Sequence, residues 1–177
     1  DGPAGDFWLR PGDSPLLFVA GGSGIAPILA VLKEAVASGV TRSATLLFGA
    51  REAQDLYALE EIEAIAKAWR GSFRFVPVLS AANDDASWTG ERGLVTEKLA
   101  QFLEPGAHGY LCGPPGMIDG AIELLRLHGV AREHIHFDRF TTQADVVAVA
   151  NSNVDMSAVE EAVAPASVAD VFHYVKY

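Results

Sequence analysis

Short apolar runs alternate with stretches of helical spacing along most of this chain, and no other feature constrains its fold as strongly. The apolar runs predict five strands, at residues 16–20, 44–48, 74–79, 110–112 and 135–140. Helical periodicity predicts helices between them, at residues 24–38, 59–69, 96–103 and 115–128. Strands that alternate with helices pair in parallel through right-handed crossovers. We therefore expect an α/β fold: a doubly wound five-stranded parallel sheet with helices on both faces.

Two segments lie outside this alternation and divide the chain into three parts. Residues 1–14 precede the first strand and contain three glycines and two prolines. Residues 15–140 form the α/β domain, and residues 141–177 form a C-terminal extension with five acids and one lysine. Apolar residues recur at helical spacing near its end, at Val168, Val171, Phe172 and Val175. The extension is either a frayed terminus or a helix that docks on the protein.

Composition excludes several classes of function. The net charge is −10 without a cluster of basic residues, which argues against binding to nucleic acid. Cys112 is the single cysteine, so the chain forms no internal disulfide and no thiolate metal site by itself. The five histidines lack the spacing of a metal site, and we predict no metal ligands.

The first residues and the hydropathy of the chain indicate the cell compartment in which the protein is expected. Residues 1–6 have neither the positive nor the apolar region of a signal peptide, and they lack an initiator Met, so we expect a fragment or a processed chain. No apolar run approaches the roughly 18 residues that a membrane span needs. With its single cysteine, the chain is expected to be cytoplasmic.

A glycine-rich turn joins the first predicted strand to the first predicted helix. Its residues are Gly21, Gly22, Ser23, Gly24, Ile25, Ala26 and Pro27. Glycines let a backbone approach a phosphate closely, and a helix start offers free N–H groups and partial positive charge to a diphosphate. The spacing differs from the G-x-G-x-x-G fingerprint of ordinary Rossmann dehydrogenases. Taken alone, the turn is either a phosphate-binding loop or a tight strand–helix connection.

A second loop of this kind follows the fourth predicted strand. It consists of Cys112, Gly113, Pro114, Pro115, Gly116 and Met117, and it enters a helix at its prolines. A small, polarizable thiol at the mouth of a parallel sheet could touch a flat ring. The alternative is a buried cysteine that fills space in the core. Ligands of such sheets bind beyond the carboxyl ends of the strands, where both loops are expected.

Together the two loops resemble the ferredoxin–NADP⁺ reductase superfamily, and more closely its oxygenase-reductase branch. In that family G-x-G-I-A-P binds the diphosphate of the dinucleotide, and C-G-P-P-x-M holds the nicotinamide. Further family motifs follow in order, at Phe48 to Arg51, Asp55 to Tyr57, Trp88 to Val95 and Phe137 to Phe140. The resemblance covers roughly residues 2–140.

The resemblance implies that this chain carries the nicotinamide-dinucleotide site of a flavin-dependent electron-transfer reductase. Residues 1–14 then correspond to the end of the flavin-binding barrel and a linker, and FAD is bound mainly by a domain that this chain lacks. In the family, hydride passes from the nicotinamide to the flavin, and electrons continue to an iron–sulfur centre such as [2Fe–2S] or to an oxygenase. The expected partners are the flavin-binding domain and a ferredoxin domain or oxygenase component. Without the flavin domain, the chain is expected to be inactive.

The resemblance also implies three residues close to the chemistry. Cys112 would lie beside the nicotinamide, and Phe140, at the family's terminal aromatic position, would cover the flavin ring. Asp138 stands where relatives often have Glu. For Asp138, a solvated acid at the end of a strand is an equally open interpretation.

The adenosine half of the ligand is expected beside Arg51, Glu52 and Ser80, which follow the second and third strands. A carboxylate such as Glu52 binds ribose hydroxyls and repels a 2′-phosphate, whereas Arg51 could pair with that phosphate. Both residues could also belong to a solvated loop. Relatives that use NADPH often carry Arg just after the Ser of the third strand, but residues 81–85 are Ala-Ala-Asn-Asp-Asp. We therefore expect NADH rather than NADPH.

Two other functions remain open at this level. The chain could be the reductase module of a flavohemoprotein, with heme as the electron acceptor. It could also be a non-catalytic nucleotide-binding or docking domain. The sequence upstream would separate these functions, because ferredoxin cysteines, globin helices and a flavin motif look unlike one another.

Overall fold

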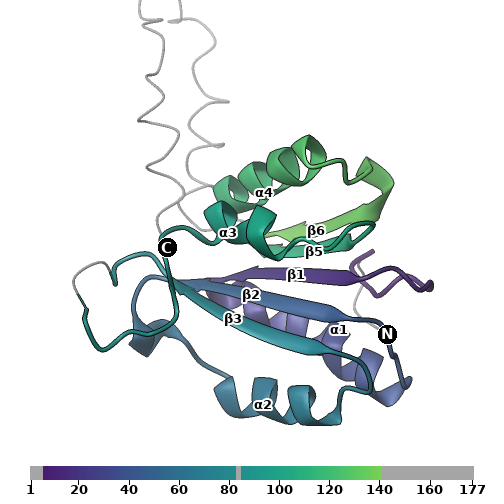
Figure 1. The fold of residues 1–177 in the computed structure, drawn as a ribbon, viewed down its shortest axis with the longest axis horizontal. Helices are drawn as coiled ribbons and strands as arrows, with labels where there is room; N and C mark the ends of the chain where they lie inside the picture. Colours follow the sequence, from purple (N-terminus) through teal and green to yellow (C-terminus); the bar gives the residue numbers. More distant parts are fainter. Residues whose placement is uncertain (1–5, 83–84, 141–177) are drawn as a thin grey trace, which may run out of the picture.

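A parallel sheet forms the centre of the molecule (Figure 1). The computed structural model describes residues 6–82 and 85–140, so the predicted extension at 141–177 and the first residues of the 1–14 segment lie outside the described residues. Within this part the strands are β1 (Leu16–Gly21), β2 (Ala44–Ala50), β3 (Phe73–Leu79), β4 (Glu91–Arg92), β5 (His108–Gly113) and β6 (Ile135–Arg139). They lie in the order β4-β3-β2-β1-β5-β6, and each neighbouring pair is parallel.

Helices cover both faces of the sheet (Figure 1). One face packs against α1 (Ile25–Ala37) and α2 (Leu59–Ala68). The other packs against α3 (Val95–Phe102) and α4 (Pro115–Leu127). The doubly wound α/β fold expected from the sequence is confirmed.

The described sheet differs from the prediction by one strand. The five predicted strands are present, and β4 adds at the outer edge, with Val78 opposite Glu91 and Leu79 opposite Arg92. Because β4 has two residues and both are charged, no apolar pattern marks it in the sequence. Strand β6 ends at Arg139, one residue before its predicted end.

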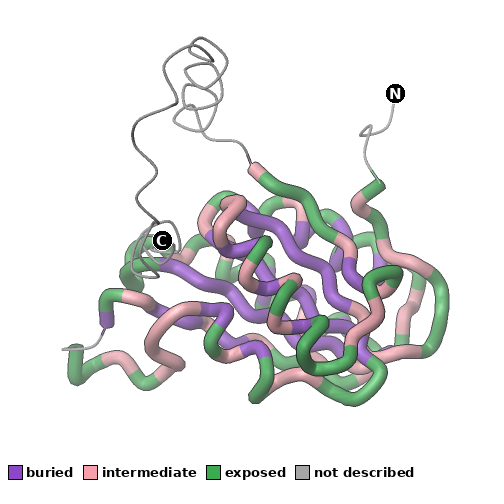
Figure 2. The backbone as a smooth tube through the Cα atoms, turned by 90° about the horizontal axis from the view of Figure 1, so that it is seen from above, coloured by how far each residue is buried: buried purple, intermediate pink, exposed green. Residues whose placement is uncertain are grey.

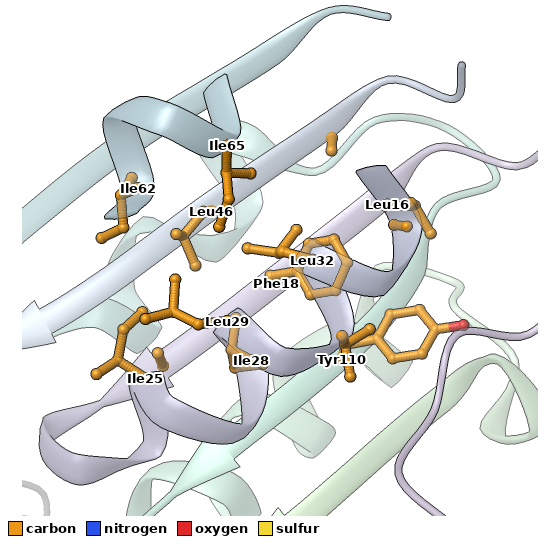
Figure 3. Packing of buried hydrophobic residues seen from close by; sticks show 14 of the residues in the cluster. Leu16, Phe18, Ile25, Ile28, Leu29, Leu32, Leu46, Ile62, Ile65 and Tyr110 are labelled. Carbon is orange, nitrogen blue, oxygen red and sulfur yellow. The ribbon is translucent and has the colours of Figure 1, made fainter. Parts of the chain in front are cut away.

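Two apolar clusters, one on each face of the sheet, hold the layers together. The central strand β1 contributes to both: Leu16, Phe18 and Ala20 join the cluster with α1 and α2, and Leu17 and Val19 join the other. Burial of each Leu, Val or Phe side chain contributes about 1.5–3 kcal/mol. Figure 3 shows the first cluster, and Figure 2 shows the buried strands running between more exposed segments.

A buried arginine anchors the segment that precedes β1. Arg42 Nε donates to the Ser14 carbonyl at 2.6 Å, and Arg42 Nη1 donates to the Arg10 carbonyl at 2.8 Å. The Arg10 N–H donates to the Tyr110 hydroxyl at 3.0 Å. These bonds fix residues 10–14 against β5 and against the turn that leads into β2.

Three histidines gather where β5 and β6 begin. The rings of His108 and His134 are stacked with their centroids 4.0 Å apart, and the ring of His136 lies 4.8 Å from that of Tyr110. Burial, followed by nearby positive groups, lowers the pKa of His108 and of His136. In residues 6–82 and 85–140, no three His, Cys, Asp or Glu side chains are arranged to hold a metal ion, and no helix has the length and apolar character of a membrane span.

Candidate functional site

The strand order reverses at β1, and this reversal positions the site. From β1 the chain builds β2, β3 and β4 on one side, and then returns to place β5 on the other side. Ligands of doubly wound sheets bind beyond the carboxyl ends of the strands at such a point. Because Ala20 of β1 lies opposite Cys112 of β5, both predicted loops begin there side by side.

The two loops touch through their glycines. A Cβ at Gly24 would overlap the carbonyl oxygen of Cys112 and would lie 2.9 Å from the Gly113 nitrogen. A Cβ at Gly113 would lie 3.3 Å from the Gly21 nitrogen and 2.6 Å from Cε of Met117. Any larger residue at Gly24 would therefore push the loops apart, because it would overlap backbone. A Cβ at Gly113 would require the end of the Met117 side chain to move and the Gly21 backbone to give by a few tenths of an ångström. Close packing of the loops thus requires glycine at position 24, whether or not a ligand is bound.

The outer half of the glycine turn is open. Gly22 has a φ of +52°, in the left-handed region that favours glycine, and a Cβ there would meet no described atom within 4 Å. Ser23 is exposed beside it. The open space at Gly22 leaves room for a phosphate to approach the backbone closely. This half of the turn fits the diphosphate of a dinucleotide.

The first turn of α1 follows directly. Gly24 is its N-cap, and no described side chain caps it. Ile25 is buried, Ala26 is exposed and Pro27 is half-buried. The Ile25 N–H donates to the Gly22 and Ser23 carbonyls. Free N–H groups at a helix start bind an anion, which the helix dipole also attracts.

The thiol of Cys112 lies in the core and not on the surface of the second loop. The residue is 0% exposed and belongs to the cluster that α1 covers. Burial raises the pKa of the Cys112 thiol to about 12, and the Asp138 carboxylate adds to the rise. The thiol is therefore neutral near pH 7, so it is no nucleophile. Its contact with the nicotinamide stays a prediction.

Phe140 and Asp138 lie beside the same loop. The Phe140 N–H donates to the Gly113 carbonyl at 3.0 Å, and Phe140 packs against the cluster that contains Cys112. Asp138 is opposite Cys112 in the β5–β6 register and is exposed. The fold thus brings the three predicted catalytic candidates to one place, and Cys112 contacts the glycine turn at Gly24 through its backbone.

The remaining residues of the second loop determine how the chain enters α4. Pro114 is the N-cap and Pro115 is the first helical residue, where the missing N–H costs little. Met117 is 0% exposed, with its side chain under Gly113. These residues fix the path of the backbone into α4 by packing and by the prolines, not by polar side-chain contacts.

Arg51, Glu52 and Ser80 lie at the carboxyl ends of β2 and β3, on the other side of β1 from Cys112. The Ser80 N–H donates to the Ala50 carbonyl at 3.0 Å, so the two strand ends are joined. The side chains of Arg51 and Glu52 are exposed. The predicted site residues therefore form two groups along one edge of the sheet, with the glycine turn between them.

Tyr57 also reaches the glycine turn. Its hydroxyl donates to the Gly22 carbonyl at 3.3 Å, and its ring meets Phe48 edge to face, with centroids 6.0 Å apart. The motif Asp55-Leu56-Tyr57 marks this residue in the sequence but gives no reason for a place in the site. Only the fold shows that this segment returns to Gly22.

Comparisons with known proteins agree with this geometry. The model of the oxidoreductase NAD-binding domain family matches residues 18–123. The xylene/toluene monooxygenase electron transfer component of Pseudomonas putida is 47% identical over 140 residues, which cover 78% of this chain and 40% of that protein. The reductase component of phenol 2-monooxygenase from Pseudomonas sp. is 38% identical over 148 residues, covering 81% of this chain and 42% of that protein.

Solved structures show the same likeness. The crystal structure of a cytochrome P450 reductase from Amycolatopsis matches with a TM-score of 0.71 at 34% identity, covering 80% of this chain and 43% of that one. This chain thus spans about two fifths of the length of the relatives it matches. The matched family model takes in both loops of the site. The chain therefore belongs to the oxidoreductase NAD-binding domain family, in the ferredoxin–NADP⁺ reductase superfamily and its branch of oxygenase reductase components.

Proposed function

We propose that this chain is the NADH-binding domain of a flavin-dependent reductase that delivers electrons to an oxygenase or an iron–sulfur protein. The observation that carries the proposal is the contact between the glycine turn after β1 and the Cys112–Met117 loop, at the switch in strand order. The relatives named above are themselves electron transfer or reductase components. Their names support the same role for the protein to which this chain belongs.

In the proposed function, the residues of the site bind and orient the cofactors, and the cofactors carry out the reaction. When bound, NADH supplies a hydride to FAD, which is held mainly by the flavin-binding domain. The turn Gly21–Pro27 binds the diphosphate through backbone N–H groups, and the Cys112–Met117 loop holds the nicotinamide. Phe140 and Asp138, which lie beside the same loop, would then stand between the nicotinamide and the flavin domain. Because a misplacement of about 1 Å can slow a reaction on the order of a hundredfold, the close packing of these loops matters for the rate.

The preference for NADH rests on the loops after β2 and β3. The exposed carboxylate of Glu52 would bind the ribose hydroxyls and repel a 2′-phosphate. No arginine follows Ser80 directly, and the next residues are acidic. Arg51, which is exposed beside Glu52, would by itself favour NADPH.

The proposed function also assigns a role to each part of the chain. Residues 1–14 end the flavin-binding barrel and link it to the domain at 15–140, residues 141–177 are an extension, and the chain alone is inactive. A [2Fe–2S] centre or an oxygenase accepts the electrons. The single cysteine favours a cytoplasmic location, since disulfides are rare in that compartment. A flavohemoprotein is the less favoured alternative, because the relatives named above are electron transfer or reductase components of monooxygenases.

The test uses the flavin-containing protein that carries this chain. The visible spectrum of the oxidised protein separates flavin alone, flavin with [2Fe–2S], and heme. Rapid anaerobic mixing should show that NADH bleaches the flavin faster than the same concentration of NADPH. Failure of both nucleotides to reduce the flavin would contradict the proposed function.

A further inference from the structure

The side chain of Tyr57 is held partly exposed beside the glycine turn. It is 45% exposed, and its hydroxyl donates to the Gly22 carbonyl at 3.3 Å. The same carbonyl accepts the Ile25 N–H, so both of its lone pairs have a donor. We propose that Tyr57 is a positioning residue for the dinucleotide diphosphate, acting by orienting the peptide between Gly22 and Ser23. This inference rests on the proposed function and deepens it.

The geometry of the peptide unit explains how the hydroxyl acts. A trans peptide is planar, so its C=O and N–H point in opposite directions. Gly22 lies in the left-handed region, where glycine moves with little steric resistance. By holding the Gly22 oxygen, Tyr57 sets the direction of the Ser23 N–H, two residues before α1 begins. It also keeps the negative end of this peptide dipole from turning toward a bound anion.

The segment before α2 is built to hold Tyr57 in this place. The Asp55 carboxylate accepts the Glu52 N–H at 3.0 Å, and the Glu52 side chain caps the turn in return. Leu56 packs against the core, which fixes the next residue. Ala58 then has a φ of +59°, which costs a residue with a side chain about 1–2 kcal/mol. Strain of this kind recurs where a ligand is clamped.

The test compares two variants that each lose one hydroxyl. Tyr57→Phe removes the bond to Gly22 and keeps the ring, whereas Tyr110→Phe removes the acceptor of the Arg10 N–H in the segment before β1. The 177-residue chain is titrated with NADH and with ADP-ribose, both of which carry the diphosphate, by amide NMR, which also detects weak binding. Tyr57→Phe should raise both Kd values about threefold to tenfold, as loss of one hydrogen bond predicts.

Two further readouts separate positioning from stability. In the free protein, Tyr57→Phe should shift the Ser23 amide signal and leave Tm within a few degrees of the parent value. Tyr110→Phe should leave both Kd values unchanged.

The outcomes are distinct. Parent-like Kd values in Tyr57→Phe, with or without a fall in Tm, would overturn the positioning role and leave the proposed function intact. If the parent chain binds neither NADH nor ADP-ribose, the proposed function fails, and the positioning role fails with it.

Discussion

At the scale of single residues, the surroundings of Cys112 determine how reactive its thiol is. Its thiol is fully buried, and burial, with the Asp138 carboxylate, raises its pKa to about 12. Because the thiolate is the reactive form, the folded chain should not react with Ellman's reagent at about pH 8. The same chain unfolded in guanidinium chloride should react through its one cysteine. Rapid labelling of the folded chain would show that the thiol is accessible and that its place in the core is wrong.

Two glycines of one turn should respond differently to substitution. Gly24→Ala places a methyl group on the Cys112 backbone, and overpacking of this kind costs about 1–3 kcal/mol. A side chain at position 22 would enter open space, and Asn tolerates a left-handed φ. Gly22→Asn should therefore lower the free energy of unfolding by less than about 1 kcal/mol. Urea unfolding followed by circular dichroism measures both free energies of unfolding. Equal stability of the two variants would mean that the loops are not packed as described.

At the scale of elements, Arg42 connects the segment before β1 to the domain. Arg42→Met leaves the Ser14 and Arg10 carbonyls without their donors, which should lower the free energy of unfolding by about 1–3 kcal/mol. Amide hydrogen exchange should become faster in residues 10–14. Arg132→Met, at an exposed position, is the control. Parent-like stability and exchange in Arg42→Met would show that the segment is held by other contacts.

The elements themselves follow from apolar patterning wherever it is strong. The strand at 16–20 is apolar throughout because helices cover both of its faces, and Pro115 marks the start of α4. The short edge strand β4 has no such pattern, since Glu91 and Arg92 pair with β3 through their backbones. Its position depends on the loop before it, where Arg92 donates to the carbonyls of Ala82, Asp85 and Trp88. Contacts of this kind are not periodic, so the sequence does not reveal them.

At the scale of the whole molecule, the histidine cluster makes stability depend on pH. The pKa of His108 is lowered by burial, then by His134 and Arg42, and that of His136 is lowered by burial, then by Arg10 and the other two histidines. Below about pH 6.5 the unfolded chain therefore binds protons that the folded chain does not, and stability falls as the pH falls.

Replacement of His108 tests this dependence. Between about pH 7 and pH 5, the Tm of the His108→Gln variant should fall less than the Tm of the parent chain. His128→Gln, which removes an exposed histidine outside the cluster, is the matched control. An unchanged pH dependence in His108→Gln would contradict the role of the cluster.

The candidate site could be predicted in part from the sequence. The two loops carry family motifs, and a doubly wound topology places them together at the carboxyl ends of β1 and β5. The requirement for Gly24 against the Cys112 backbone could not be predicted, since it depends on the separation of two segments far apart in the chain. The hydrogen bond from Tyr57 to Gly22 joins positions 35 residues apart in the chain, and no motif in the sequence indicates it.

In the proposed function, a dinucleotide lies along the carboxyl edge of the sheet, with its diphosphate at the glycine turn. Amide NMR spectra of the chain during titration with NADH test it most directly. The largest shifts should fall on residues 21–26, with further shifts at Gly113, Gly116, Met117, Arg51 and Glu52. The amides of residues 132–136, at the opposite ends of the strands, should not shift. Saturable shifts confined to other residues, or no shifts at all, would contradict it.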